Sequence, residues 1–253
     1  MKHNTQYGTR LLFCSMALTS LLLGCGGGGD GGGGGGGREA QPDAGVTARL
    51  PARSTNIALT SDDRRLVVVN RQNDSVSVIQ VKDGNDVDVD AKLAEISVGK
   101  EPRYVAITPD DQAAYVTNAV DGSVSVIDLA AATPKLKGNP IAVGSEPRGI
   151  AITPNGTYAF VANHTEGSVS VIQIRTNQVI NTVYVGGNPM AVTISNDGDL
   201  DDRDETVYVT RFFSELADPV NRPDGFNDAK RGVIDYFGVG AAIASGAGVA
   251  QLY

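Results

Sequence analysis

Short runs in which hydrophobic and polar residues alternate dominate the chain from about residue 54 onward. The block Ser-Val-Ser-Val-Ile occurs three times, at Ser75–Ile79, Ser123–Ile127 and Ser168–Ile172. Alternation with a period of two is the pattern of a β-strand, because successive side chains of a strand point to opposite faces. No part of this region keeps the 3.6-residue period of a helix. The pattern predicts an all-β fold.

The predicted strands are organised in repeats. The three Ser-Val-Ser-Val-Ile blocks begin 48 and 45 residues apart. A second block, Glu-Pro-Arg-x-x-Ala-Ile-Thr-Pro, precedes two of them at Glu101–Pro109 and Glu146–Pro154, with weaker copies at Ser54–Ser61 and from Asn188. Four short strands in a repeat of this length are typical of a β-propeller blade. We predict units at about 54–100, 101–145, 146–187 and 188–253.

The second unit shows the pattern most clearly. We predict its four strands at Tyr104–Thr108, Ala114–Thr117, Ser123–Leu129 and Asn139–Val143. The tetrapeptide Tyr-Val-Thr-Asn covers the end of the second strand and the residue after it, Asn118. With the two repeated blocks, it resembles the repeat of the YVTN β-propeller family over about residues 54–211. The resemblance implies blades of four antiparallel strands in a ring that usually has seven blades. It implies no single function, since the family is similar in fold to archaeal surface-layer domains and to many bacterial envelope proteins.

The fourth unit departs from the repeat. Arg211 replaces the usual Asn, an insertion follows at about Phe212–Lys230, and Gly232–Phe237 stands where Ser-Val-Ser-Val-Ile is expected. After Gly238 the sequence becomes rich in Gly and Ala. We therefore expect an incomplete fourth blade and an incomplete ring, as a truncated reading frame would produce. Completion of the ring between chains is the alternative, and a closed four-bladed ring is the third interpretation.

The N-terminus predicts export and lipid attachment. Residues 1–24 have a basic start, a short apolar stretch at Leu11–Leu23 and the ending Leu-Leu-Gly-Cys at Cys25. The stretch is shorter than the ~20 residues that a spanning helix needs, and the layout is that of a signal peptide. The ending resembles the lipobox of bacterial lipoproteins, which implies that Cys25 is acylated. A plain signal peptide with a chance Cys and a retained anchor are the alternatives.

The residues after the cleavage site predict a tether. Cys14 is removed with the signal peptide, so Cys25 is the remaining thiol and no intramolecular disulfide can form. Residues 26–37 are Gly apart from Asp30, and such a segment is a flexible coil with a span of roughly 20 Å. We assign residues 25–53 to this tether. Gly26 after the lipidated Cys, in place of Asp, favours the outer membrane of the cell envelope.

The charge limits the partners. The chain has 29 acidic and 21 basic residues, a net charge of −8. Phosphate backbones and anionic lipid surfaces repel a protein this acidic, so we expect no nucleic acid partner. We expect it to bind the membrane through its N-terminal lipid, and to bind an envelope protein or glycan that the sequence does not identify.

Two arginines are candidate ligand-binding residues. Arg103 and Arg148 occupy equal positions at the start of the first strand of their units, near one mouth of a propeller's channel, where ligands often bind. The alternative is a structural role, with each guanidinium paired to Glu101, Glu146 or a neighbouring blade.

The acidic run Asn196–Glu205 is the candidate metal site. Calcium takes six to eight oxygen ligands, and Asp197, Asp199 and Asp201 offer carboxylates on one loop. The run lacks the Gly and Glu positions of an EF-hand, and a solvated turn between two strands is the favoured interpretation. His164 is the remaining His of the mature chain, and we expect it in a solvated turn. Without a second His or an available Cys, the common zinc, copper and haem sites are not expected.

No set of residues converges on a catalytic mechanism. We therefore predict a non-enzymatic envelope lipoprotein without a cofactor that presents a propeller to a protein, glycan or small ligand, with calcium at the acidic run as the alternative to a solvated turn. One alternative is an enzyme or redox module, since similar propellers serve as lactonases, quinoprotein dehydrogenases and haem-bearing nitrite reductases. A structural spacer in a surface layer is the other.

Overall fold

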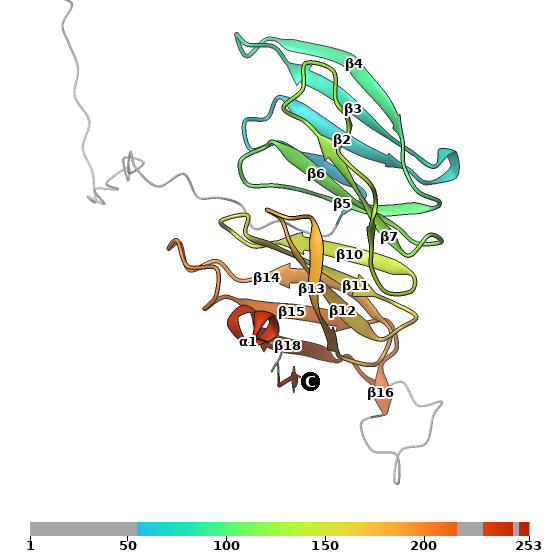
Figure 1. Ribbon diagram of the computed structural model, residues 1–253, viewed down its shortest axis with the longest axis vertical. Coiled ribbons are helices and arrows are strands. Elements are labelled where there is room, and N and C mark those ends of the chain that lie inside the picture. The colour runs from blue at the N-terminus through green and yellow to red at the C-terminus, as the bar shows by residue number, and fades with distance from the viewer. Residues whose placement is uncertain (1–54, 217–229, 245–247, 253) are drawn as a thin grey trace, which may run out of the picture. The chain divides into compact units, whose positions relative to one another are not determined.

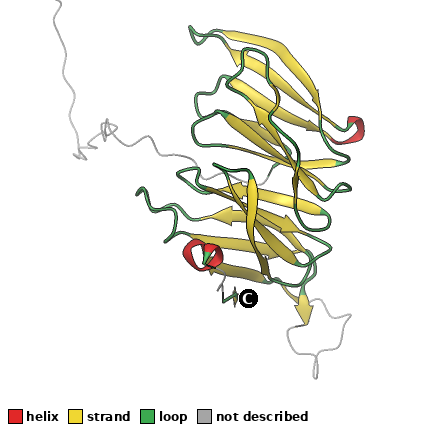
Figure 2. Cartoon of the chain, viewed as in Figure 1, coloured by secondary structure: helices red, strands yellow, loops and turns green. Residues whose placement is uncertain are grey.

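The computed structural model describes residues 55–216, 230–244 and 248–252, and these residues form an all-β protein (Figures 1 and 2). Four antiparallel sheets follow one another along the chain, each with its strands paired in chain order as in a propeller blade. The predicted fold class is confirmed, and the sheets do not close into a ring. Cys25 and the segments predicted to be a signal peptide and a glycine tether lie outside the described residues.

The strands of each blade have the following bounds. Blade 1 comprises β1 Ile57–Leu59, β2 Arg65–Asn70, β3 Ser75–Lys82 and β4 Asp88–Ser97. Blade 2 comprises β5 Pro102–Ile107, β6 Ala113–Asn118, β7 Ser123–Asp128, β8 Lys135–Leu136 and β9 Ile141–Ala142. Blade 3 comprises β10 Pro147–Ile152, β11 Tyr158–Asn163, β12 Ser168–Gln173 and β13 Gln178–Tyr184. Blade 4 comprises β14 Pro189–Ile194, β15 Thr206–Arg211, β18 Ile234–Gly238 and β19 Ala250–Leu252.

Four short elements lie between or beside these strands. They are the 3₁₀ turn η1 Arg71–Asn73, the hairpin strands β16 Glu215–Leu216 and β17 Lys230–Arg231, and the helix α1 Val239–Ile243. In the part of the chain that the structure describes, no helix is long and apolar enough to cross a membrane.

The predicted outer strand of blade 2 is the largest difference from expectation. In place of one strand at Asn139–Val143, two short strands, β8 and β9, pair with different parts of β7. Pro140 lies between β8 and β9 and donates no backbone hydrogen bond, and Gly138, in the same interval, has a φ of 72°. The strand therefore breaks where these residues stand. The fourth unit, expected to be incomplete, nevertheless has a fourth strand, β19.

Neighbouring blades share their cores. One face of each blade packs against the opposite face of the next, so Tyr115 of blade 2 is buried with Ile150 of blade 3, and Phe160 of blade 3 is buried with Val207 of blade 4. Each of the first strands β1, β5 and β10 contacts the first strand of the next blade, which makes these and β14 the inner strands of the array. Residues at the start of these strands are thereby brought together from different blades.

In each of the first three blades one Asn side chain bonds the two Ser hydroxyls of the Ser-Val-Ser block, and we call this contact the pin. The pin explains why the block is repeated. The amide nitrogen of Asn163 donates to the hydroxyls of Ser168 and Ser170, both at 2.9 Å. Asn70 and Asn118 make the same pair of contacts in blades 1 and 2. Because Asn118, Asn163 and their serines are buried, these bonds satisfy polar groups that could not reach water.

Blade 4 replaces this pin with an ion pair. Arg211 stands at the Asn position and donates from Nε and Nη2 to the carboxylate of Asp235, at 2.7 and 2.8 Å. Asp235 is fully buried and occupies the position of Ser170. Arg211 also bonds Glu215 and the carbonyl of Val185. Arg211 and Asp235 therefore replace the Asn and one Ser of the other blades together, and each of the two new side chains has its partner in the other.

Candidate functional site

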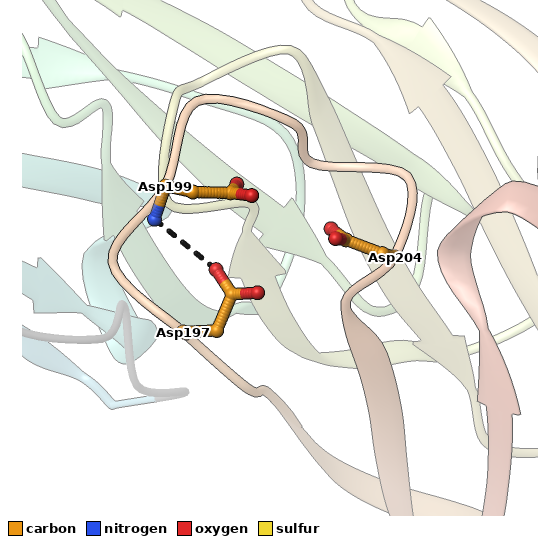
Figure 3. Close-up of side chains that lie close together, drawn as sticks. All are labelled: Asp197, Asp199 and Asp204. Atoms are coloured by element: carbon orange, nitrogen blue, oxygen red, sulfur yellow. Dashed lines mark hydrogen bonds between the residues drawn. The ribbon is translucent and has the colours of Figure 1, made fainter.

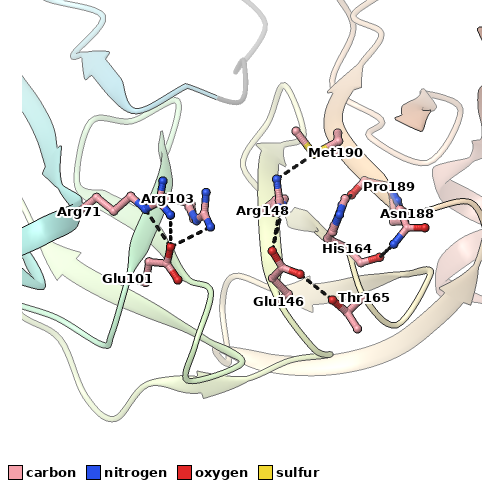
Figure 4. Close-up of polar contacts among 10 residues, drawn as sticks. All are labelled: Arg71, Glu101, Arg103, Glu146, Arg148, His164, Thr165, Asn188, Pro189 and Met190. Carbon is pink, nitrogen blue, oxygen red and sulfur yellow. Dashed lines mark hydrogen bonds and ion pairs between the residues drawn. The ribbon is translucent and has the colours of Figure 1, made fainter. Parts of the chain in front are cut away.

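Five charged residues gather where the inner strands begin (Figure 4). We call Arg71, Glu101, Arg103, Glu146 and Arg148 the inner-strand cluster. Arg103 and Arg148 are the second residues of β5 and β10, as the sequence predicts, and Arg71 comes from η1 of blade 1. Each Glu immediately precedes an inner strand with a φ near 55°, a left-handed conformation that is uncommon for Glu. The same turn in two blades therefore presents both carboxylates at equivalent positions.

Glu101 links blades 1 and 2. Its Oε1 atom accepts hydrogen bonds from Nε of Arg71, at 2.9 Å, and from Nη2 of Arg103, at 2.8 Å. The two guanidinium groups therefore share one carboxylate. The pairing with Glu101 that the sequence offered as a structural role for Arg103 is present.

Glu146 has a different set of partners in blade 3. It accepts from Nε of Arg148 at 3.1 Å and from the hydroxyl of Thr165 at 2.6 Å. The hydroxyl of Thr165 is the first cause of the lowered pKa of Glu146, and it outweighs a partial burial that alone would raise the pKa. Arg148 also donates to the sulfur of Met190 at 3.2 Å. Thioether sulfur is a weak acceptor, so this guanidinium is less fully satisfied than one between carboxylates.

Arg103 is a partly buried guanidinium of the cluster with a nitrogen that lacks a hydrogen bond within the described part of the chain. Its side chain is 19% exposed, and its Nε has no hydrogen-bond partner among the described residues. Burial lowers the pKa of Arg103; Glu101 opposes this, whereas the positive charges of Arg71 and Arg148 add to it. Three guanidinium groups therefore face two carboxylates. The cluster has a surplus of positive charge in an acidic protein.

An aromatic group lies beside the cluster. His164 was expected in a solvated turn, but the residue is only 8% exposed, and its Nδ1 lies 3.1 Å from the carbonyl oxygen of Pro189. Its ring meets Phe212 edge to face at 5.6 Å, and Phe212 meets Phe213 at 4.8 Å. The prediction for His164 was wrong because blade 4, distant in sequence, covers the turn. Phe212 and Phe213 themselves remain more than half exposed.

The acidic run forms the loop between β14 and β15, as predicted, but it brings together a different triad (Figure 3). Asp197, Asp199 and Asp204 each place one carboxylate oxygen within 4.8 Å of the others, and all three are exposed. Asp201 instead accepts a hydrogen bond from the backbone nitrogen of Arg203. The pKa of Asp204 is raised, first by loss of hydration and then by the neighbouring Asp199 and Asp197 charges. Calcium binding at Asp197, Asp199 and Asp201 stays a prediction, although in the structure Asp204, and not Asp201, lies beside the other two carboxylates.

The same loop contains a buried carboxylate that the sequence analysis missed. Asp202 accepts hydrogen bonds from the hydroxyl of Thr153 at 2.6 Å and from the backbone nitrogens of Asn155 and Thr157, so it joins blade 4 to a turn of blade 3. Asp111 makes the equivalent contact with Ser61 between blades 2 and 1. An Asp in the loop after the first strand of a blade was therefore the sequence signal that could have predicted this contact with the preceding blade.

Asp202 predicts a pH-dependent contribution to stability. Burial alone would raise its pKa, but the hydrogen bonds from Thr153, Asn155 and Thr157 together lower it below the ordinary 3.8. The ionised carboxylate therefore stabilises the fold at every pH above about 4, and this contribution is lost as the pH falls through the lower folded-state pKa. We expect Asp202→Asn to cost ~1–3 kcal/mol at pH 7, because its amide group faces backbone donors.

Urea unfolding at pH 7 and pH 3 measures this contribution. The difference between wild type and Asp202→Asn should shrink at the lower pH. Asp201→Asn is the matched control in the same loop, and its exposed side chain predicts a change within ~0.5 kcal/mol. Equal effects of the two substitutions at pH 7 would contradict the assignment.

Two shallow clefts lie away from the inner-strand cluster. The larger, about 350 Å³, lies between blades 1 and 2, and its charged lining residues are Arg64, Arg65, Lys82, Asp62, Asp83 and Asp111. These three basic and three acidic residues balance, and each carboxylate accepts a hydrogen bond from a nearby backbone nitrogen. The chemistry therefore points to the inner-strand cluster as the candidate site.

The consecutive antiparallel blades define a β-propeller protein, and the candidate site lies on their inner strands. Two overlapping segments, residues 39–139 and 90–186, match the family model described as lactonase, 7-bladed β-propeller. Together they span 39–186, more than half of the 253 residues. The chain belongs to this family. The narrower resemblance to the YVTN repeat stays a prediction.

Solved structures of other proteins share the fold. Hydrazine synthase from Kuenenia stuttgartiensis matches with 23% identity and a TM-score of 0.57, over 78% of this chain and 48% of that one. A functionally unknown protein from Desulfotomaculum acetoxidans matches with 19% identity and a TM-score of 0.55, over 73% and 51%. A protein from Lactobacillus plantarum matches with 16% identity and a TM-score of 0.53, over 80% and 55%.

These likenesses show the fold alone, and the chain spans about half the length of the structures it matches. No curated protein matches the sequence.

Proposed function

We propose that this protein is a lipid-anchored envelope propeller of the YVTN repeat type that binds a small anionic ligand at the inner-strand cluster. The observation that carries the binding proposal is the surplus of guanidinium groups there, with a buried Arg103 Nε that has no partner among the described residues. The Asn and Ser–Ser pin supports the repeat assignment, because it gives a physical role to residues of both repeated blocks.

A carboxylate or phosphate group fits this cluster best. Guanidinium presents a planar set of donors that matches the oxygens of these groups and strengthens their hydrogen bonds through charge. An incoming anion would also relieve the repulsion between Arg103 and Arg148 that lowers the pKa of Arg103. The two glutamates oppose the anion, but they already accept hydrogen bonds from Arg71, Arg103, Arg148 and Thr165.

The exposed aromatic pair suggests the rest of the ligand. Phe212 and Phe213 stand next to His164, whose backbone nitrogen bonds the carbonyl of Glu146 in the cluster. Aromatic rings offer a flat apolar surface, on which the C–H face of a sugar ring can pack. An anion beside such a surface is the chemistry of a sugar acid, and we propose this ligand class.

Titration with gluconate and with inorganic phosphate tests the binding site. We expect Arg103→Gln with Arg148→Gln to weaken gluconate binding at least tenfold, because each charge-assisted hydrogen bond contributes ~1.5–3 kcal/mol. Arg175→Gln is the matched control, since Arg175 is exposed in the turn between β12 and β13. Calorimetry at two salt concentrations should show weaker binding at high salt. Equal affinities of the double variant and the control would overturn the proposal.

Family membership favours a second candidate, hydrolysis of a sugar lactone. In that reaction a carboxylate accepts a proton from the water that adds to the lactone carbonyl, and a guanidinium stabilises the oxyanion. The ring C–O bond then breaks, and the carboxylate returns the proton to the leaving ring oxygen to give the hydroxy acid. Glu146 is the available carboxylate, but its lowered pKa makes it a weak base. This is the physical reason for placing binding first.

The same preparations separate the two candidates. With glucono-δ-lactone, a binding protein leaves the spontaneous rate of acid release unchanged. A rate above that background, lost in Glu146→Gln while gluconate affinity is retained, would establish the lactonase activity instead.

A further inference from the structure

The larger cleft, between blades 1 and 2, is lined by four loops and the strand ends beside them. Its volume of about 350 Å³ lies within the range of about 300–1,000 Å³ that is usual for small-molecule sites. Blade 1 contributes the loops after β1 and β3, and blade 2 contributes the loops after β5 and β7. The inner-strand cluster lies at the start of β5, whereas the cleft follows its end. The two places are therefore separated by the length of an inner strand.

Two cationic side chains of this cleft lack strong partners. Lys82 is half-buried, and its ammonium group has no hydrogen bond or ion pair among the described residues. Arg64 is also half-buried, and its Nε is buried without a hydrogen-bond partner in the part of the chain that the structure describes. Its Nη2 lies 3.8 Å from a carboxylate oxygen of the exposed Asp86, and so exposed an ion pair contributes little. Both cations have therefore lost hydration that the protein does not fully replace.

Two carboxylates of the same cleft bind their own turns through Oδ1. In Asp62 this atom accepts hydrogen bonds from the hydroxyl of Thr60 at 2.6 Å and from the backbone nitrogen of Arg64 at 3.0 Å. In Asp83 it accepts from two backbone nitrogens of the turn after β3, at 2.7 and 3.0 Å. The other carboxylate oxygen, Oδ2, keeps capacity for a further donor in both residues. Burial alone would raise the pKa of Asp62, but these hydrogen bonds and the Arg64 charge lower it, so the carboxylate is ionised at neutral pH.

The remaining charged groups of the cleft are taken up by contacts between blades 1 and 2. Both oxygens of Asp111 accept hydrogen bonds from Ser61, and Arg65 donates to the backbone carbonyl of Leu129. Two cations and two carboxylates are left for a ligand. A simple anion would also meet the two carboxylates, and a simple cation would meet the two basic side chains. A ligand that carries both charges instead finds an opposite charge for each of them.

Two neutral side chains indicate the polarity of the rest of the ligand. Nε2 of Gln80 donates to the carbonyl of Lys82, and Nε2 of Gln112 donates to the carbonyl of Asp110, both at 3.1 Å. The Oε1 atom of each side chain has no partner among the described residues. A hydroxyl or amide group of a ligand would supply the missing donor. A polar group therefore fits this part of the cleft better than an apolar one.

We propose that the cleft binds a free α-amino acid with a polar side chain. The carboxylate of the ligand contacts Arg64 and Lys82, and its ammonium group contacts Asp62 and Asp83. All of these contacts are charge-assisted hydrogen bonds, which are stronger than those between neutral groups. The inference goes beyond the proposed ligand of the inner-strand cluster and does not depend on it.

Calorimetric titration of the full chain in detergent with L-glutamine, L-asparagine and L-serine tests the proposal. We expect L-glutamine to bind. N-acetyl-L-glutamine lacks the ammonium group and L-glutaminamide lacks the carboxylate, so each should bind roughly tenfold more weakly or worse, as loss of a charge-assisted hydrogen bond predicts. No binding of the three amino acids at millimolar concentration would refute the proposal, and so would equal affinities for L-glutamine and its two analogues.

Substitutions in the cleft give a second test. Lys82→Gln and Asp62→Asn should each weaken the binding of L-glutamine roughly tenfold, because each removes one charged partner. Asn keeps an oxygen for the turn, and circular dichroism checks that each variant keeps its β-sheet content. Lys137→Gln and Asp63→Asn are the matched controls, since both side chains are exposed and neither lines the cleft. Equal affinities of the cleft variants and the controls would exclude this site.

Competition separates the cleft from the inner-strand cluster. An excess of gluconate should leave L-glutamine bound, because the two ligands occupy opposite ends of the inner strands. Displacement of L-glutamine by gluconate would assign both ligands to one site and refute a separate amino-acid site. If gluconate does not bind, the result with L-glutamine stands by itself, so the two proposals fail separately.

Discussion

Cys25→Ala is expected to move the protein from the membrane fraction to the soluble fraction of the cell envelope. Each buried CH₂ of an acyl chain contributes ~0.8 kcal/mol to membrane binding, so several chains on one residue hold a protein firmly. The acidic chain has no electrostatic attraction to anionic lipids that could replace them. Without the thiol, we expect nearly all of the protein to leave the membrane. Detergent phase partitioning and incorporation of labelled palmitate measure this change.

Cys14→Ala is the matched control, because Cys14 lies in the segment that is predicted to be removed. It should leave partitioning and palmitate incorporation unchanged. Retention of Cys25→Ala in the membrane fraction would contradict the lipid anchor and support a retained apolar segment. Release of the wild-type protein without label would support a plain signal peptide.

Asp235→Ser is expected to produce the largest loss of stability among the substitutions considered. It removes the fully buried carboxylate that pairs with Arg211, whose side chain is 9% exposed, while the partly exposed Glu215 remains. Breaking a buried ion pair on one side costs ~3–5 kcal/mol. Arg211→Asn should cost a similar amount, because it leaves the fully buried Asp235 without its guanidinium. Urea unfolding followed by circular dichroism gives both free energies of unfolding.

The double variant with Arg211→Asn and Asp235→Ser should recover most of the loss. It restores the Asn and one Ser of the pin in the other blades, and replacing a buried ion pair by a compatible neutral pair is often close to neutral. The coupling between the two positions should therefore be large. Glu215→Gln is the control, because Glu215 is 36% exposed and surface ion pairs contribute ~1 kcal/mol or less. Additive losses in the double variant would contradict the pin.

Much of the fold could be predicted from local pattern. Strand β6 spans Ala113–Asn118, where alternation predicted Ala114–Thr117, and β7 spans Ser123–Asp128, where it predicted Ser123–Leu129. These strands pair within a single blade, so residues close in sequence encode both partners. The outer strand of blade 2 was misjudged, because Pro140 and Gly138 interrupt it without changing the hydrophobic pattern.

The candidate site was predictable only in part. The equal positions of Arg103 and Arg148 follow from the repeat, and the structure places both at the start of inner strands. The partners of the two arginines cannot be predicted from the repeat, because Arg71 reaches Glu101 from another blade. The acidic loop shows the same limit: the sequence favoured Asp201, but the path of the loop turns Asp204 toward Asp197 and Asp199.

The sequence by itself therefore determined the repeat, the four-stranded blade and the inner position of the two arginines. Each depends on alternation and spacing within about one repeat, which strand pairing converts directly into structure. The tertiary structure alone decided the burial of His164 and Asp202 and the sharing of Glu101 by two guanidinium groups. These properties arise where one blade contacts another, and such contacts depend on loop paths that no local period encodes.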